Sequence, residues 1–199
     1  MTLASQPLGR RERNKQEKLD RIIAAASELF AEHGVEEVTT QQIADKADIG
    51  TGTLFLYAKT KGELLLMVQN THYAQALERG RAAAENVPDV RDAVMAIMQP
   101  IVECNRTQIA NGRTYLREVA FGDPEEPHHG EALTISGRTE EALAAVLARD
   151  DSFAADAATL AHVVSAISFL SMASHASPTI SDETVMADIR NQVRALLAR

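Results

Sequence analysis

Apolar residues recur at every third or fourth position through most of this 199-residue chain, and this spacing restricts the fold more than any other feature. A half-buried strand would need strict alternation of apolar and polar residues, which the sequence lacks, whereas the observed spacing places an apolar stripe along one side of an α-helix. We therefore predict an all-α protein. The clearest stripe consists of Leu19, Ile22, Ile23, Ala26, Leu29 and Phe30.

Residues that interrupt helices divide the chain into about nine helical segments. The first segment ends at Gly34, because glycine readily takes the positive φ of a helix end. The breaks that follow residue 61 leave about six helices in the second half. Further breaks are expected at Gly50, at Val87-Pro88, at Asn111-Gly112, from Gly122 to Gly130 and at Ser177-Pro178.

Two short helices are predicted between the first helix and a longer one that begins at Lys61. The first covers residues 41–47, with Thr40 as its N-cap. The second covers residues 51–59, with Gly50 as its N-cap. Two short helices joined by a tight turn, with the first long helix packed behind them, have the dimensions of a helix-turn-helix.

Charge divides the chain into two unequal parts. Residues 1–61 contain nine basic and nine acidic side chains, whereas residues 62–199 contain eleven Arg, no Lys and nineteen acids, so the net charge of −8 arises in the second part. Residues 1–21 alone carry six basic side chains against three acids. This surplus predicts either an arm that contacts phosphates or the solvated start of a helix. We expect two domains, residues 10–65 and residues 66–199.

The stretch Gly50-Thr51-Gly52-Thr53 lies where the second short helix begins. Gly52 would let the backbone approach something large, and the exposed amides of a helix start attract phosphate. Short hydroxyls suit base edges and phosphates, while the aromatic residues Phe55 and Tyr57 suit the sugar-phosphate wall. The stretch therefore predicts an edge that docks on DNA.

At these residues the sequence resembles the TetR family of transcriptional regulators. The resemblance extends from about Leu19 to Leu65, a quarter of the chain. Three positions depart from the family pattern: Gly50 stands where a serine cap is usual, Phe55 where a tyrosine is usual, and Ala58 where an aromatic residue is usual. The positions aligned with the family pattern are Thr39-Thr40, Ile43-Ala44, the run Asp48-Ile49-Gly50-Thr51-Gly52-Thr53-Leu54-Phe55-Leu56-Tyr57-Ala58, then Lys61 and Leu64.

We hypothesise a homodimer that leaves a palindromic double-stranded operator when a small apolar effector binds, with no cofactor. The resemblance implies repression, the common outcome in the family, and leaves activation as the alternative. It also implies phosphate contacts for Thr40, Tyr57 and Lys61. Gln41 is the residue we expect to read an adenine edge, since a glutamine amide can bind adenine in a bidentate manner. The residues expected at the DNA are Thr40, Gln41, Gln42, Thr51, Gly52, Thr53, Phe55, Leu56, Tyr57 and Lys61.

No charged residue occurs between Ala157 and Ser181. The segment is long enough to span a bilayer, but its serines and histidines make it too polar for lipid, and we expect no membrane contact. A protomer of this size can cover only one side of such a helix, so the other side is expected to meet a second copy. The predicted dimer interface contains Leu160, Val163, Val164, Ile167, Leu170, Ile189, Val193 and Leu196.

An apolar ligand pocket is predicted around Pro100, whose missing amide donor should kink its helix and open space beside it. The alternative interpretation of the same side chains is ordinary core. The residues expected to line the pocket are Met95, Met98, Ile101, Cys104, Tyr115, Phe121, His162, Phe169 and Met172.

Other classes of function find less support in the sequence. A single cysteine and the lack of a leader favour a cytoplasmic protein. No nucleophile lies near a base, so we expect no enzyme, although a helical dimer that binds or processes a small molecule without regulatory DNA output is the alternative. We expect no metal site and interpret the following loop residues as solvated: Asp123, Glu125, Glu126, His128 and His129.

Overall fold

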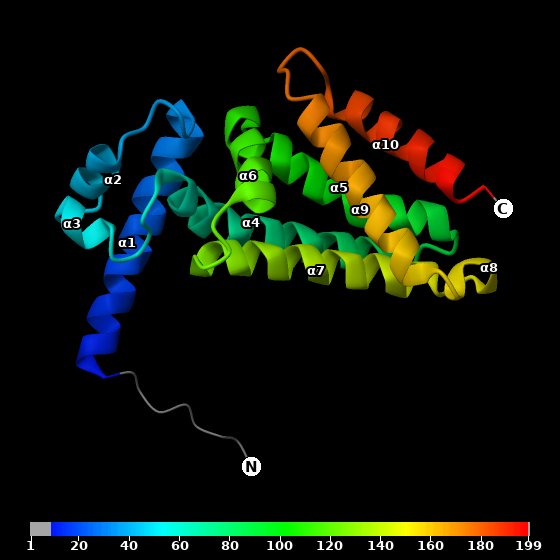
Figure 1. The fold of residues 1–199 in the computed structure, drawn as a ribbon, viewed down its shortest axis with the longest axis horizontal. Coiled ribbons are helices and arrows are strands. Elements are labelled where there is room, and N and C mark those ends of the chain that lie inside the picture. Colours follow the sequence, from blue (N-terminus) through cyan, green and yellow to red (C-terminus); the bar gives the residue numbers. More distant parts are fainter. Residues whose placement is uncertain (1–8, 199) are drawn as a thin grey trace.

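A computed structural model describes residues 9–198, and this part of the chain contains ten α-helices and no strand (Figure 1). The all-α prediction is therefore confirmed. The predicted number of about nine helices omitted α8, a four-residue helix that follows a break at residues 148–150. The helices are α1 (Arg10–His33), α2 (Thr40–Lys46), α3 (Thr51–Leu54), α4 (Lys61–Ala84), α5 (Val90–Arg106), α6 (Ile109–Phe121), α7 (Pro127–Leu147), α8 (Asp151–Ala154), α9 (Ala157–Ser174) and α10 (Asp182–Leu196).

Helices α1 to α3 form a small unit at one end of the molecule (Figure 1). Phe30 of α1, Ile43 of α2 and Leu54 of α3 are buried, and they hold the three helices together. Helix α1 ends at His33, and its C-cap Gly34 has a φ of 79°, which confirms the expected helix end. Because α1 begins at Arg10, the basic residues from there to Arg21 lie on a helix, while residues 1–8 of the predicted basic arm lie outside the described residues.

Helices α4 to α10 form the larger helical body. Helix α4 runs from the small unit into the body, where α5 and α7 lie beside it, and α9 packs between α7 and α10 (Figure 1). Helix α9 has 18 residues and a mean hydropathy of 1.5, which would suffice for a membrane span by length and composition. Leu160, Ala161 and Val164 are buried against the neighbouring helices, so the apolar character of α9 serves packing within the body.

The break predicted at Asn111-Gly112 is wrong. Helix α6 runs through both residues, and the interruption lies at Thr107-Gln108 instead. The side chain of Gln108 caps the new helix, since its Oε1 accepts a hydrogen bond from the Asn111 amide at 2.9 Å. Asn111 uses its own side chain for a tertiary contact with α1, which the sequence pattern could not reveal.

Candidate nucleic-acid interface and ligand cavities

A capping box fixes the start of α2. The hydroxyl of Thr39 accepts a hydrogen bond from the Gln42 amide at 3.2 Å, and Gln42 Oε1 accepts one from the Thr39 amide at 2.8 Å. The N-cap is therefore Thr39, and the prediction of Thr40 was wrong by one residue. Gln42 was predicted to contact DNA, and although it is exposed, its side-chain oxygen is already used by the cap.

Gln41 and Thr51 form an ordered pair on the outer surface of the small unit. The Thr51 hydroxyl donates to Gln41 Oε1 at 2.7 Å, which links α3 to α2. Gln41 Nε2 donates one hydrogen to Asp45 Oδ1 at 2.7 Å. The amide is thus held in one orientation while the residue stays exposed, as preorganised contact with a partner requires.

The second short helix is shorter than predicted. Helix α3 ends at Leu54, and backbone hydrogen bonds of turn type continue the chain as far as Ala58. Beyond α3 the exposed fractions of Phe55 and Leu56 are 44% and 83%, so both side chains face outward. Gly50 is the N-cap, as expected.

Gly52 has no reason inside the protomer to be glycine. A Cβ atom built at this exposed position would meet no other atom within 4 Å. Glycine in a helix costs about 0.5–1 kcal/mol relative to alanine. An external partner that approaches the backbone closely would account for this cost.

Two of the predicted phosphate contacts already have partners in the protomer. The Tyr57 hydroxyl donates to the Lys15 carbonyl at 3.3 Å, which ties the end of the small unit to α1. The ammonium group of Lys61 donates to the Glu36 carbonyl at 2.9 Å and retains two further hydrogens. Thr40 and Thr53 are partly exposed. The basic side chains of the first half of α1 are exposed and add positive charge beside this surface: Arg10, Arg11, Arg13, Lys15, Lys18 and Arg21.

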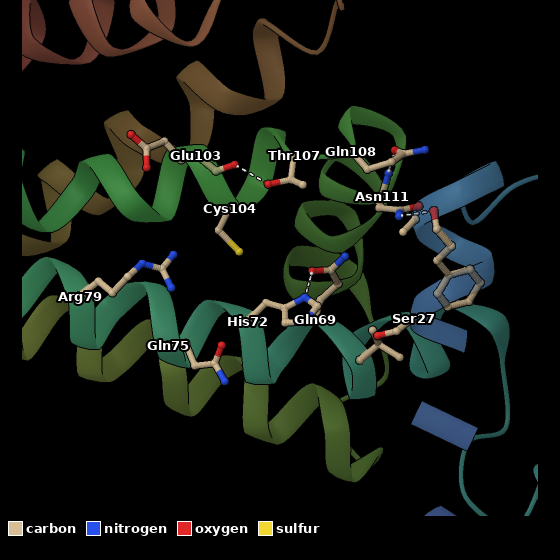
Figure 2. Close-up of a pocket in the computed structure, with 13 residues that line it drawn as sticks. Ser27, Gln69, His72, Gln75, Arg79, Glu103, Cys104, Thr107, Gln108 and Asn111 are labelled. Atoms are coloured by element: carbon tan, nitrogen blue, oxygen red, sulfur yellow. Dashed lines mark hydrogen bonds between the residues drawn. The ribbon is translucent and has the colours of Figure 1, made fainter. Parts of the chain in front are cut away.

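A polar pocket of about 410 Å³ lies at the junction of α1, α4, α5 and α6 (Figure 2). Figure 2 shows His72 and Arg79 along α4 and Cys104 on α5, with the Cys104 sulfur pointing toward α4. Burial raises the pKa of the Cys104 thiol to about 11, so this thiol is protonated at neutral pH. Cys104 was expected in an apolar pocket and instead lines this polar one.

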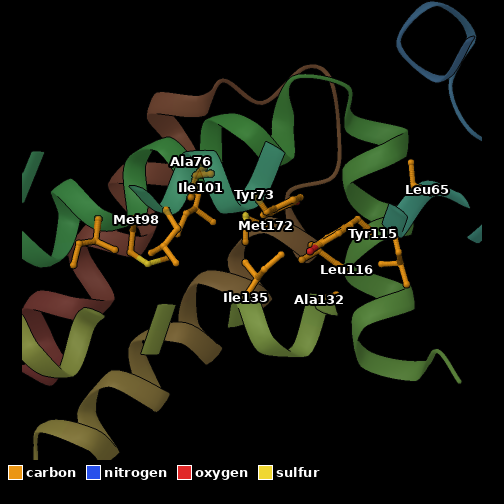
Figure 3. Packing of buried hydrophobic residues seen from close by; sticks show 14 of the residues in the cluster. Leu65, Tyr73, Ala76, Met98, Ile101, Tyr115, Leu116, Ala132, Ile135 and Met172 are labelled. Carbon is orange, nitrogen blue, oxygen red and sulfur yellow. The ribbon is translucent and has the colours of Figure 1, made fainter. Parts of the chain in front are cut away.

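A second, apolar cavity of about 80 Å³ lies in the body, between α4, α5, α6, α7 and α9. Figure 3 shows the packing of buried side chains in this region, several of which line the cavity. Five of the predicted pocket residues line it, namely Met98, Ile101, Tyr115, Phe169 and Met172. The other eight lining residues, which the sequence pattern did not predict, are Tyr73, Leu116, Val119, Ile135, Ser136, Thr139, Ser165 and Ser168.

Three of the predicted pocket residues lie elsewhere. Phe121 is 87% exposed at the end of α6. The side chain of His162 is 72% exposed, and its Nδ1 lies 3.0 Å from Glu140 Oε1. Met95 is buried beside Val193, where it lines a separate hollow between α5 and α10. Helical spacing places side chains on one side of a helix but does not say which neighbour that side faces.

Two tyrosines stack in the wall of the apolar cavity. The rings of Tyr73, from α4, and Tyr115, from α6, have centroids 4.0 Å apart and planes inclined by 8°. Burial raises the pKa of both hydroxyls far above the ordinary value of 10, so both keep their protons at neutral pH. Tyr73 has no special neighbours in the sequence, and only the fold reveals this pair.

The predicted dimer interface separates into two groups. Leu160, Val164, Ile189 and Val193 are buried within the protomer, so their assignment to a dimer interface is wrong. The other four remain accessible: Val163, Ile167 and Leu196 are partly buried, and Leu170 is 64% exposed.

The start of α7, predicted to be a solvated loop, packs against the small unit. Glu126 and His129 are buried. Glu126 Oε1 lies 2.6 Å from Lys59 Nζ, and His128 Nε2 donates to the Tyr57 carbonyl at 3.3 Å. Within residues 9–198, no three His, Cys, Asp or Glu side chains gather as metal ligands would.

Comparison with known proteins identifies the small unit. Residues 22–68 match the family model described as bacterial regulatory proteins, tetR family. The amino-terminal unit is a TetR-family DNA-binding domain. A fatty acid metabolism regulator protein of Bacillus subtilis (strain 168) is 34% identical over 67 residues, and the match spans about a third of that relative's length, 34% of each chain.

Solved structures extend the likeness of fold beyond the TetR-family domain. A TetR transcriptional regulator from Rhodococcus sp. RHA1 superimposes with a TM-score of 0.72 and 17% identity, over 94% of this chain and 98% of that one. FadR of Thermus thermophilus, a TetR family transcriptional repressor in complex with lauroyl-CoA, superimposes with a TM-score of 0.70 and 20% identity, over 90% and 93% of the two chains. The chain as a whole therefore has the fold of these regulators.

Proposed function

We propose that this protein is a ligand-responsive transcriptional regulator, a repressor released from a palindromic DNA operator by an apolar effector. Residues 10–65 would read the DNA, and residues 66–199 would bind the effector and form the dimer. The observation that carries the proposal is the exposed Gln41–Thr51 pair beside Gly52 on the TetR-family domain. The fixed Gln41 amide suits an adenine edge, and the open backbone at Gly52 suits a close phosphate.

A second copy of the chain would cover the exposed side of α9. Val163, Ile167 and Leu170 follow one another along this helix at the spacing of a single face. Leu170 is exposed to 64% in the protomer, and the lack of charge on this helix favours a protein partner over water. Two copies joined here would place two TetR-family domains in successive major grooves, about 34–36 Å apart.

The effector would bear a hydrocarbon chain. The cavity beside the tyrosine pair is lined mainly by apolar side chains, including Met98, Leu116 and Met172. This protein resembles in fold a repressor solved in complex with lauroyl-CoA, so a fatty acyl thioester is the first compound to test. Helix α4 leads from the DNA-binding domain into the wall of this cavity. A ligand that tilts α4 would therefore change the distance between the two DNA-binding domains of the dimer. Coupling of about 1–3 kcal/mol suffices for such a switch.

We expect the regulator to act in the cytoplasm and to perform no catalysis.

Titration of selected DNA with the purified protein tests this proposal. DNA fragments are first selected from a random pool, and their affinity is then followed by fluorescence anisotropy at rising salt, with and without lauroyl-CoA. We expect the affinity to fall steeply with salt, because phosphate contacts release counterions, and to fall again when lauroyl-CoA binds. Equal affinity for a scrambled sequence, or an affinity indifferent to salt, would contradict the proposal.

A further inference from the structure

The apolar cavity must grow to accept a ligand. Its volume is about 80 Å³, whereas sites for small molecules measure about 300–1,000 Å³. A hydrocarbon chain can therefore enter only if some lining side chains move away. The consequence of binding depends on what these side chains hold in place.

Among the described lining residues, only Tyr73 and Tyr115 make side-chain hydrogen bonds to another helix. The hydroxyls of Ser136, Thr139 and Ser168 each donate to a carbonyl one turn back in their own helix. The remaining lining residues are apolar, apart from Ser165. Movement of the tyrosine pair would therefore change hydrogen bonds to other helices, whereas movement of the other lining side chains would not.

The first polar connection leads from Tyr73 to the end of α1. The Tyr73 hydroxyl oxygen accepts from Asn105 Nδ2 at 2.6 Å, and the same Nδ2 donates to the Gly112 carbonyl at 3.2 Å. The adjacent residue of α6 is Asn111, whose Nδ2 donates to the Phe30 carbonyl at 2.8 Å. Asn111 Oδ1 accepts from the Val35 amide at 2.7 Å. The position of α6 is thus tied both to the cavity and to the DNA-binding domain.

The second polar connection leads from Tyr115 to the other end of the same domain. The Tyr115 hydroxyl donates to Asn70 Oδ1 at 3.1 Å, and Asn70 Nδ2 donates to the His128 carbonyl at 2.9 Å. The His128 amide donates to Glu63 Oε1 at 2.8 Å, and its ring donates to the Tyr57 carbonyl at 3.3 Å. This connection reaches the end of the helix-turn-helix and the start of α4.

We propose that Tyr73 and Tyr115 together transmit effector binding to the DNA-binding domain through these two polar connections. The inference rests on the proposed function, because it assumes that the apolar cavity receives the effector. Asn70 and Asn111 are each 1% exposed and Asn105 is 5% exposed, so none can exchange its partner for water. The two rings are stacked 4.0 Å apart, so a ligand that enters between them must move at least one ring. That ring would either lengthen the hydrogen bonds of its connection or move α6 or α7.

The variants Tyr73→Phe and Tyr115→Phe, alone and together, test the inference, because they keep both rings and remove only the hydroxyls. The matched control is Thr139→Val, which removes a hydroxyl from the same cavity without touching either connection. The probe is lauroyl-CoA, and the readouts are its dissociation constant and the DNA affinity with and without it. In the wild type we expect lauroyl-CoA to weaken DNA binding about 10-fold or more.

The double variant should still bind lauroyl-CoA and DNA, but lauroyl-CoA should weaken its DNA binding less than about 3-fold, well below the usual range of allosteric coupling. Thr139→Val should respond as the wild type does. A full response in the double variant would overturn the inference and leave the proposed function intact. A wild type that binds lauroyl-CoA with no effect on DNA would count against the proposed function.

A second measurement needs no ligand. Hydrogen exchange of the Val35 amide reports whether Asn111 holds the end of α1. We expect this amide to exchange faster in Tyr73→Phe than in the wild type or in Thr139→Val, while the melting temperature of each variant shows that it is folded. If the Val35 amide exchanges at the same rate in Tyr73→Phe and the wild type, the Tyr73 hydroxyl does not affect the contact between Asn111 and the end of α1, and the first connection is disproved.

Discussion

The DNA-binding domain and the helical body use their polar side chains in different ways. In the domain, the bonds that cap α2 and orient Gln41 join residues three to ten positions apart, although the Tyr57 hydroxyl reaches the Lys15 carbonyl, 42 residues away. In the body, buried asparagines join distant segments: Asn111 bonds to Phe30, 81 residues away, and Asn70 bonds to the His128 carbonyl, 58 residues away. The difference suggests that the reading surface is set locally, while its position depends on contacts made across the body.

The strongest test of the body's role is the exposed face of α9. Leu170→Arg should place a charge in the proposed dimer interface without disturbing the protomer, because Leu170 is 64% exposed. We expect a monomer by analytical ultracentrifugation. A monomer can bind only one half of a palindromic operator, so the affinity for selected DNA should fall about 100-fold or more.

The matched control is Leu133→Arg, since Leu133 is another large apolar residue, 46% exposed, but on α7. It should remain dimeric and bind DNA as the wild type does. A dimeric Leu170→Arg protein would show that the second copy sits elsewhere.

Removal of the Asn111 side chain should affect stability more than any change at the DNA surface. Asn111→Ala leaves the Val35 backbone amide without its partner in a buried site. The Phe30 carbonyl loses one of its two bonds and keeps the one from the Gly34 amide. We expect the free energy of unfolding to fall by about 1–3 kcal/mol, measured by urea denaturation, since an unsatisfied buried group costs about 1–3 kcal/mol.

The control for this change is Asn86→Ala, in the exposed connection between α4 and α5. Its effect should stay within about 0.5 kcal/mol. A similar small effect for Asn111→Ala would mean that the contact between α6 and α1 contributes little.

Gly52→Ala tests the DNA-binding domain, where we expect a change in DNA affinity without a loss of stability. We expect the free energy of unfolding to stay equal or to rise by up to about 1 kcal/mol, because alanine suits a helix better and meets no atom in the protomer. The affinity for selected DNA should fall about 10-fold, because a methyl group blocks close approach to the backbone.

Gly137→Ala is the control, since a Cβ at that position in α7 also meets open space. It should gain similar stability and keep full DNA affinity. Unchanged DNA binding in Gly52→Ala would remove this residue from the interface.

The smallest effect is expected at Glu63, where the two regions meet. Burial raises the pKa of this carboxyl above its ordinary value of 4.5, so the folded state favours the protonated form. This contribution to stability is fully present below pH 4.5 and is lost as the pH rises through the raised pKa. Thermal unfolding between pH 4 and pH 8 should therefore show the wild type losing stability relative to Glu63→Gln as the pH rises.

Glu103→Gln, at an exposed position of α5, is the control for Glu63→Gln. If the wild type instead gained stability relative to Glu63→Gln with rising pH, the hydrogen bond from the His128 amide would outweigh the burial of the carboxylate.

The elements that the sequence predicted well are those governed by local rules. The apolar stripe of α1, the glycine at its end and the Gly50 cap of α3 depend on neighbouring residues, and all appear as expected. Helix spacing also identified Met98, Ile101 and Met172 as cavity residues. It misplaced Phe121, because the orientation of the last turn of α6 is decided by packing and not by spacing.

By itself, the sequence determined that the chain is helical and that its amino-terminal part resembles the TetR family, since helix periodicity, caps and turns act over a few residues. Only the tertiary structure decided which side of α9 is buried, that Asn111 belongs to a helix instead of a break, and that Tyr73 meets Tyr115. Many side chains have the same apolar or polar character, so pattern alone cannot assign their partners. The partners are chosen when distant helices pack and each buried polar group must find its hydrogen bond.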